Sequence, residues 1–118
     1  MTPERIRIKV AEAMGWKRKP EFDYTSHQDP MFREHGERRE MWGDDSGRLI
    51  PTSMLPNYPF DLNACAEFEA ELFKCEILWK KYRDLIYAFE THNDTAFATA
   101  LQRCEAYLRV KGLWEETP

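Results

Sequence analysis

The feature that most constrains this fold is a long stretch without residues that break regular structure. Residues 60–111 contain neither glycine nor proline, whereas the segment before them holds most of both. Glycine and proline are the strongest local signals for turns and helix ends. The sequence therefore predicts an irregular first half and a helical second half, with the boundary at Pro59-Phe60-Asp61.

This boundary carries a helix start signal. The carboxylate of Asp61 is suited to accept hydrogen bonds from the backbone N–H groups of Asn63 and Ala64, and its charge favours the positive end of a helix. We expect Phe60 to pack on Cys65 as a hydrophobic staple. The pattern predicts a helix from Asp61 to about residue 76.

The first half is predicted from its caps and breakers. Thr2 as N-cap, Pro3 in the first turn and Gly15 as the stop predict a helix over residues 2–15. Residues 16–58 hold frequent breakers, and we expect at most short strands there, over residues 21–25 and 48–51. A connection this long is unusual in a compact domain and is normally functional.

The second half contains two further segments with regular spacing. Residues 77–90 fit a helix and also show some alternation, so helix is favoured and strand stays open. The last helix is predicted from about Asp94 to Lys111, capped by Asn93 or Asp94 and stopped by Gly112. Its predicted apolar stripe consists of Phe97, Leu101, Cys104 and Leu108. These elements predict a predominantly helical α+β fold with three to four helices, a small or reduced sheet and a long irregular segment over residues 16–58.

Length and composition indicate one folded domain over residues 1–118. The apolar content of 42% is sufficient for a modest core. The net charge of −4 argues against a bulk electrostatic nucleic-acid binder, and no apolar run is long enough to span a membrane. Three cysteines without C-x-x-C spacing predict reduced thiols in a cytoplasmic protein.

Three blocks of the chain together resemble small proteins of tailed phages and prophages that carry the phage ABA-sandwich domain. The blocks are Met1-Thr2-Pro3-Glu4 running to Gly15-Trp16, Leu55-Pro56-Asn57-Tyr58 with Asp61-Leu62-Asn63-Ala64, and Ala98-Thr99-Ala100 with Arg103-Cys104-Glu105-Ala106-Tyr107-Leu108. The resemblance covers roughly half of the chain. It implies helix–sheet–helix layers, and it brings no catalytic residues.

The sequence shows no catalytic constellation. Glu69 and Glu76 fall on one apolar helix face, and two interpretations stay open: acid–base or metal-binding carboxylates, or structural partners of a Lys or Arg on the first or last helix. The structural interpretation is favoured. No cysteine and histidine residues have zinc-ligand spacing, so buried inert thiols and no metal or cofactor are predicted. The cysteines are Cys65, Cys75 and Cys104, and the histidines are His27, His35 and His92.

The irregular segment carries the candidate binding residues. Arg33, Arg38 and Arg39 offer planar donor groups suited to carboxylate or phosphate, and Trp42 offers a rigid apolar ring. These four residues are predicted to contact a partner. The alternative is that nearby glutamates neutralise the arginines within the loop, namely Glu34, Glu37 and Glu40.

The sequence therefore favours a non-enzymatic phage or prophage accessory protein that binds a host or phage protein in the cytoplasm. The alternative is an anti-defence protein that sequesters a small nucleotide-type signalling ligand. Neither function needs a cofactor, and neither a membrane nor a nucleic acid is expected as a partner. Monomer and homodimer both stay open, the dimer pairing through the apolar segment at residues 77–89.

Overall fold

The computed structural model describes residues 1–25, 38–92 and 98–116, and the chain forms two compact units. Unit 1 consists of Met1–Val10 and Pro56–Pro118, and unit 2 consists of Ala11–Leu55. Each unit has its own buried apolar side chains.

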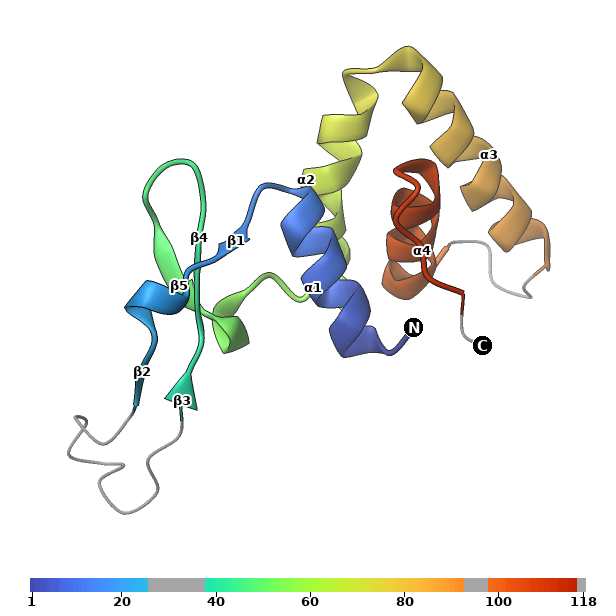
Figure 1. The fold of residues 1–118 in the computed structure, drawn as a ribbon. Coiled ribbons are helices and arrows are strands. Elements are labelled where there is room, and N and C mark those ends of the chain that lie inside the picture. The colour runs from blue at the N-terminus through green and yellow to red at the C-terminus, as the bar shows by residue number, and fades with distance from the viewer. Residues whose placement is uncertain (26–37, 93–97, 117–118) are drawn as a thin grey trace. The chain divides into compact units, whose positions relative to one another are not determined.

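Unit 1 is helical. It contains α2 (Leu62–Phe73), α3 (Glu76–His92), α4 (Ala100–Val110) and the first part of α1 (Pro3–Ala13). Helices α2, α3 and α4 contact one another pairwise, as can be followed in Figure 1. The buried residues that these three helices contribute are Ala64, Cys65, Phe68, Leu72, Tyr82, Ala100, Cys104, Ala106, Tyr107 and Leu108.

Phe68 of α2 is at the centre of the aromatic core of unit 1. Its ring stacks on Tyr107 with the centroids 4.5 Å apart, and it meets Tyr82 edge-on at 6.4 Å and Tyr58 at 6.0 Å. Offset and edge-to-face pairs of this kind contribute about 0.5–1.5 kcal/mol each beyond their burial. One aromatic side chain therefore joins α2 to α3, to α4 and to the segment that precedes α2.

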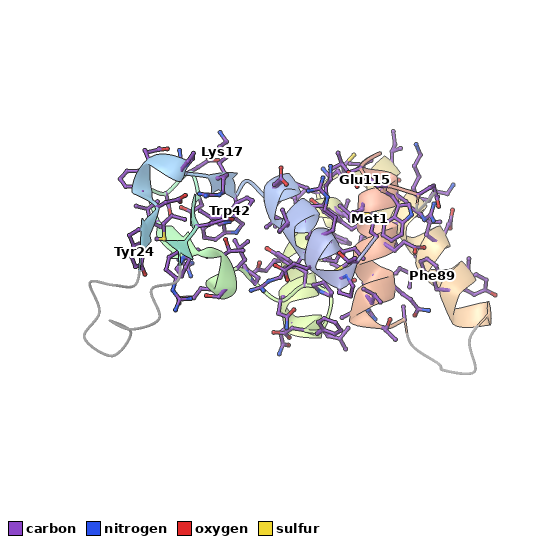
Figure 2. All side chains as sticks on the ribbon, turned by 60° about the horizontal axis from the view of Figure 1, so that its bottom comes forward. Met1, Lys17, Tyr24, Trp42, Phe89 and Glu115 are labelled. Carbon is purple, nitrogen blue, oxygen red and sulfur yellow. The ribbon has the colours of Figure 1, made fainter. Side chains whose placement is uncertain are left out.

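A carboxylate near the C-terminus joins the two ends of unit 1. The Oε1 atom of Glu115 lies 3.2 Å from Arg5 Nη2 and 3.1 Å from Lys9 Nζ, both on α1. Figure 2 shows Met1 and Glu115 close together. Because the side chains in these ion pairs are partly exposed, the pairs fix the position of the segment more than they add stability.

The predicted helix stops are confirmed. Gly15 after α1 and Gly112 after α4 have φ values of 102° and 72°, in the region that favours glycine. The next backbone N–H reaches back into the helix in both cases, from Trp16 to Ala11 O at 3.0 Å and from Leu113 to Leu108 O at 2.8 Å. Both helices thus end in a Schellman motif.

The predicted helix starts are confirmed at two of three positions. The N–H of Arg5 donates to Thr2 Oγ1 at 3.2 Å, and the N–H of Asn63 donates to Asp61 Oδ1 at 2.9 Å. Phe60, however, is 67% exposed, so the predicted staple on Cys65 is wrong. The hydrogen bond of Asp61 therefore fixes the start of α2 without the apolar contact.

The predicted start of the last helix is wrong. Helix α4 begins at Ala100, where Thr99 and Gln102 form a reciprocal capping box. This box satisfies two backbone N–H groups at once, which a single Asn or Asp cap does not. The predicted caps and the first residue of the predicted stripe, namely Asn93, Asp94 and Phe97, lie outside the described residues. In place of Leu101, which is exposed, the stripe includes Ala100 and Tyr107.

Residues 77–90 are helical, as the favoured interpretation predicted. They belong to α3, which is separated from α2 by a break at Lys74 and Cys75. The helix predicted to run to about residue 76 therefore ends at Phe73. Cys75 lies in the break and is exposed, so the prediction that all three cysteines are buried is wrong for this one.

Unit 2 contains short strands. Its described residues form β1 (Lys17–Arg18), β2 (Tyr24–Thr25), β3 (Arg38–Arg39), β4 (Met41–Gly43) and β5 (Leu49–Pro51), with 3₁₀ turns η1 (Pro20–Phe22) and η4 (Thr52–Met54). Strand β4 is the centre of an antiparallel sheet with the order β1-β4-β5, and β2 pairs with β3 (Figure 1). Strands expected over residues 21–25 and 48–51 are present in part, as β2 and β5.

The predominantly helical α+β fold is confirmed. The described residues contain four α-helices and a small three-stranded antiparallel sheet. The segment predicted as mostly irregular contains more strand residues than expected. The sequence pattern did not reveal them, because each strand is too short to produce a periodic pattern. None of the helices in the described ranges combines the length and apolar character required to cross a membrane.

Removing the cap of α2 tests its start. Asp61→Ala should lower the free energy of unfolding by about 1 kcal/mol, because the hydrogen bond to the N–H of Asn63 is lost. Asp61→Asn is the matched control, since asparagine caps equally well and should keep most of the stability. Urea unfolding followed by circular dichroism measures the difference, and equal stability of Asp61→Ala and the wild type would contradict the capping role.

Candidate functional site

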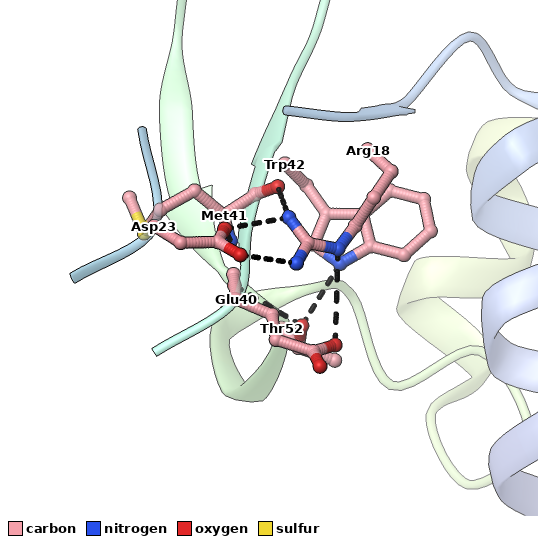
Figure 3. A network of polar contacts seen from close by, with 6 residues as sticks. All are labelled: Arg18, Asp23, Glu40, Met41, Trp42 and Thr52. Carbon is pink, nitrogen blue, oxygen red and sulfur yellow. Dashed lines mark hydrogen bonds and ion pairs between the residues drawn. The ribbon is translucent and has the colours of Figure 1, made fainter. Parts of the chain in front are cut away.

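Unit 2 is held together by an ion pair between β1 and the residue after η1. The Nη1 and Nη2 atoms of Arg18 donate to the two carboxylate oxygens of Asp23, each at 2.6 Å (Figure 3). Arg18 Nη1 also donates to Met41 O at 2.9 Å, and the N–H of Met41 donates to Asp23 Oδ1 at 2.9 Å. Hydrogen bonding to Asp23 raises the pKa of Arg18, so this charge is permanent. The pair fixes β4 relative to β1 and η1.

A second set of bonds joins β4 to η4. The ring nitrogen of Trp42 donates to Thr52 Oγ1 at 2.8 Å, as Figure 3 shows. The hydroxyl and the backbone N–H of Thr52 both donate to Glu40 O, at 3.1 and 2.9 Å. The Trp42 side chain is 5% exposed, so its one polar atom has its partner inside unit 2.

A hollow of about 240 Å³ lies beside these bonds. Its lining residues come from β3, β5, η4 and the residue before β4: Arg39, Glu40, Pro51, Thr52 and Ser53. We call it the Arg39 hollow. Its lining includes a guanidinium, a carboxylate and the side chain of Ser53, whereas the Thr52 hydroxyl is already bonded to Trp42 and Glu40. The hollow is therefore suited to bind a polar group.

The structure brings together part of the predicted binding set. Arg39 lines the Arg39 hollow, and Trp42 supports its wall through the bond to Thr52. The backbone of Arg38 pairs with Thr25 in the β2–β3 ladder, and Arg33 lies outside the described residues. The burial of Trp42 places its ring in the core of unit 2, where it holds the wall in position. The binding role of the four residues stays a prediction.

Sequence reasoning did not find the other side of the hollow. Pro51, Thr52 and Ser53 come next to Glu40 because β4 and β5 pair with Met41 opposite Pro51. The available signal was the turn Asp44-Asp45-Ser46-Gly47, which connects these strands. Treating it as a hairpin would have placed the two sides together.

Glu69 has the structural role that was favoured from the sequence. Its Oε2 accepts from Tyr82 Oη at 3.0 Å and from Arg103 Nη1, also at 3.0 Å, the latter on the last helix. Burial, with the Glu69 charge as the next cause, raises the pKa of the Tyr82 hydroxyl, which therefore stays a donor. Glu76 is exposed in the first turn of α3, where a negative charge favours the positive end of the helix.

Cys65 and Cys104 are buried in unit 1. Cys65 Sγ donates to Tyr58 O at 3.2 Å, and the hydrogen bond with Cys65 together with burial raises the pKa of Cys104. The thiolate is the nucleophile in cysteine chemistry, so the raised pKa of Cys104 disfavours such a role for it. Within the described part of the chain, no group of three or more His, Cys, Asp or Glu side chains could hold a metal ion.

Comparison with protein-family models, with curated proteins and with solved structures found no match. The resemblance to the phage ABA-sandwich family therefore stays a prediction, carried by the residues of three blocks of the sequence.

Removing the acceptor of the Trp42 ring tests the support of the hollow. Thr52→Val keeps the shape of the side chain but leaves the buried Trp42 N–H without its partner, which costs about 1–3 kcal/mol of unfolding free energy. Thr52→Ser is the control, because it keeps the hydroxyl and should remain close to the wild type. Thermal unfolding of the wild type, Thr52→Val and Thr52→Ser measures the difference. Similar unfolding midpoints for the two variants would contradict a stabilising role of the hydrogen bond between Trp42 and Thr52.

The carboxyl group of Asp44, in the turn between β4 and β5, should titrate at a lower pH than an ordinary aspartate. The Oδ1 atom of Asp44 accepts from the Ser46 hydroxyl at 2.6 Å and from the N–H groups of Ser46 and Arg48, each at 3.0 Å. These bonds, with the Ser46 hydroxyl as the largest cause, lower the pKa of Asp44 below its ordinary value of 3.8. A lowered folded-state pKa stabilises the turn above pH 3.8, and this contribution is lost as the pH falls through the folded-state pKa.

Measurement of the Asp44 carboxyl resonance by NMR should give a midpoint below 3.8, and Ser46→Ala should raise it. A midpoint for Asp44 that Ser46→Ala leaves unchanged would contradict the assigned cause.

Proposed function

We propose that this protein acts by binding another protein, without catalysing a reaction, and that the Arg39 hollow receives an acidic side chain of the partner. The observation that carries the proposal is the wall itself: Arg39 lines the hollow together with Thr52 and Ser53, and the Thr52 hydroxyl fixes this wall by accepting from Trp42 and donating to Glu40 O. The resemblance noted in the sequence makes a host or phage protein in the cytoplasm the expected partner.

The size of the hollow supports a protein partner over a nucleotide. Sites that enclose a drug-sized ligand usually measure roughly 300–1,000 Å³. The Arg39 hollow, at about 240 Å³, is smaller than that range. It is suited to one side chain that projects from a larger surface.

The guanidinium of Arg39 is the group of the hollow that attracts an acidic side chain. Glu40 is the carboxylate of the wall, and its Oε2 lies 3.8 Å from Arg18 Nε. Because Arg18 is already paired with both carboxylate oxygens of Asp23, Glu40 opposes an acidic group and Arg39 must supply the attraction. A guanidinium such as Arg39 binds a carboxylate through two parallel N–H donors, which adds orientation as well as energy.

A second candidate is the sequestration of a nucleotide-type ligand in unit 1. A hollow of about 420 Å³ between α3 and α4 is large enough, and its lining includes two cations, Lys81 and Arg109, and the carboxylate of Asp84. Arg109 is paired with Glu105 at 3.2 Å and with Glu116 at 3.0 Å, so an anionic ligand must compete with two carboxylates. These pairs and the charge of Asp84 weigh against an anionic ligand in this hollow. Thermal stabilisation by a panel of cyclic and linear nucleotides tests it.

Charge reversal at the Arg39 hollow tests the proposed function. The probe is a displayed library of random peptides selected on the wild-type protein, and we expect the selected peptides to carry Asp or Glu. Arg39→Glu should weaken binding of the selected peptides at least about tenfold, because a charge-assisted hydrogen bond is replaced by repulsion. Lys17→Glu, an exposed reversal on β1, is the matched control and should leave binding unchanged.

Melting temperatures are measured on the same samples, so that a loss of binding is not mistaken for unfolding. Trp42 is left intact because its ring is buried. Selected peptides without acidic residues, or equal binding by the Arg39→Glu and wild-type proteins, would show that the hollow is not the contact site.

A further inference from the structure

Helix α3 has a face with exposed apolar side chains. Ile77 and Tyr87 are each 68% exposed, although both are large apolar side chains. The opposite side of the helix carries Tyr82, which is 2% exposed and contacts Phe68. Among the described residues, α3 packs against α2 and α4 (Figure 1).

Four exposed residues lie along this side of α3, and Asp84, at its edge, also lines the hollow between α3 and α4. Ile77, Lys80, Asp84 and Tyr87 follow one another at intervals of three, four and three residues, which is the spacing of one helical face. All four side chains are exposed. We call them the outer face of α3. It has an apolar side chain at each end and two opposite charges between them.

The outer face is complementary to itself. Ile77 and Tyr87 lie five positions on either side of residue 82, and Lys80 and Asp84 lie two positions on either side of it. A second α3 that runs antiparallel, with its residue 82 level with the first, therefore brings Ile77 to Tyr87 and Lys80 to Asp84. A two-fold axis makes each of these contacts twice.

We propose that the outer face of α3 is a contact surface between two copies of this chain, paired antiparallel about residue 82. The apolar residues supply the buried area, and the charges select the orientation. A parallel in-register pairing would place Lys80 on Lys80 and Asp84 on Asp84, which repel. The arrangement of charges along the helix thus favours one orientation of a second copy over the other.

The expected dimer is weak and depends on concentration. Helix α3 has 17 residues, which corresponds to a length of roughly 25 Å. A single pair of helices of this length gives an interface at the small end of specific protein contacts. The outer face belongs to unit 1 and the Arg39 hollow to unit 2, so this inference and the proposed function can fail separately.

Charge exchange tests the pairing. The variants are K80D and D84K, each measured alone and in an equimolar mixture by sedimentation equilibrium over a wide concentration range. The wild type should approach twice the chain mass of 14.1 kDa at high concentration. Each variant alone brings like charges together in both symmetric contacts, so its dimer dissociation constant should rise at least about tenfold.

The mixture separates this arrangement from others. When K80D pairs with D84K, both symmetric contacts again join opposite charges, so association should return to within about threefold of the wild type. K17E, an exposed charge reversal on β1 in unit 2, is the control and should dimerise like the wild type. Circular dichroism verifies that all variants are folded.

Three results would overturn the proposal. They are a wild-type mass of 14.1 kDa at every concentration, a dimer that the single variants do not weaken, and a mixture that stays as weak as its components. The first would leave another protein as the occupant of this face.

Discussion

The geometry of unit 2 depends on the ion pair between Arg18 and Asp23. The strands of this unit are two or three residues long, so their ladders provide few backbone hydrogen bonds. The pair adds bonds between elements, because both of its members also bond to the backbone of Met41. Removing one member would leave a partly buried charge without its partner, which is more costly than the net contribution of the pair. The pair therefore specifies one arrangement of the strands.

Unit 1 is stabilised in a different way, by apolar burial around Phe68. Its polar groups are arranged around that core, and the hydroxyls of Tyr58 and Tyr82 reach Glu67 and Glu69 at its edge. In the part of the chain that the structure describes, every buried side-chain nitrogen or oxygen has a hydrogen-bond partner. Satisfied polar groups at the border of an aromatic core add specificity without a desolvation penalty.

Many of the helix ends could be predicted from sequence because their signals are local. Asp61, Gly15 and Gly112 act within one turn of their own positions, and all three have the predicted role. The start of α4 was missed because several neighbouring residues are good caps, and only the pairing of Thr99 with Gln102 distinguishes the one used. The strands and the wall of the Arg39 hollow depend on β4–β5 pairing, which no single segment contains.

The Arg39 hollow and the outer face of α3 also differ in whether local sequence signals or the pairing of distant segments form them. The Arg39 hollow exists only when distant segments meet, so its arginine was visible in the sequence and its hydroxyl groups were not. The outer face of α3 needs only the helical spacing of residues 77–87. Single exposed apolar residues are common and carry no meaning alone. Here Ile77 and Tyr87 enclose Lys80 and Asp84 symmetrically, and all four side chains are exposed. This symmetric order on exposed positions, rather than any single residue, is the reason for proposing an antiparallel contact between two copies.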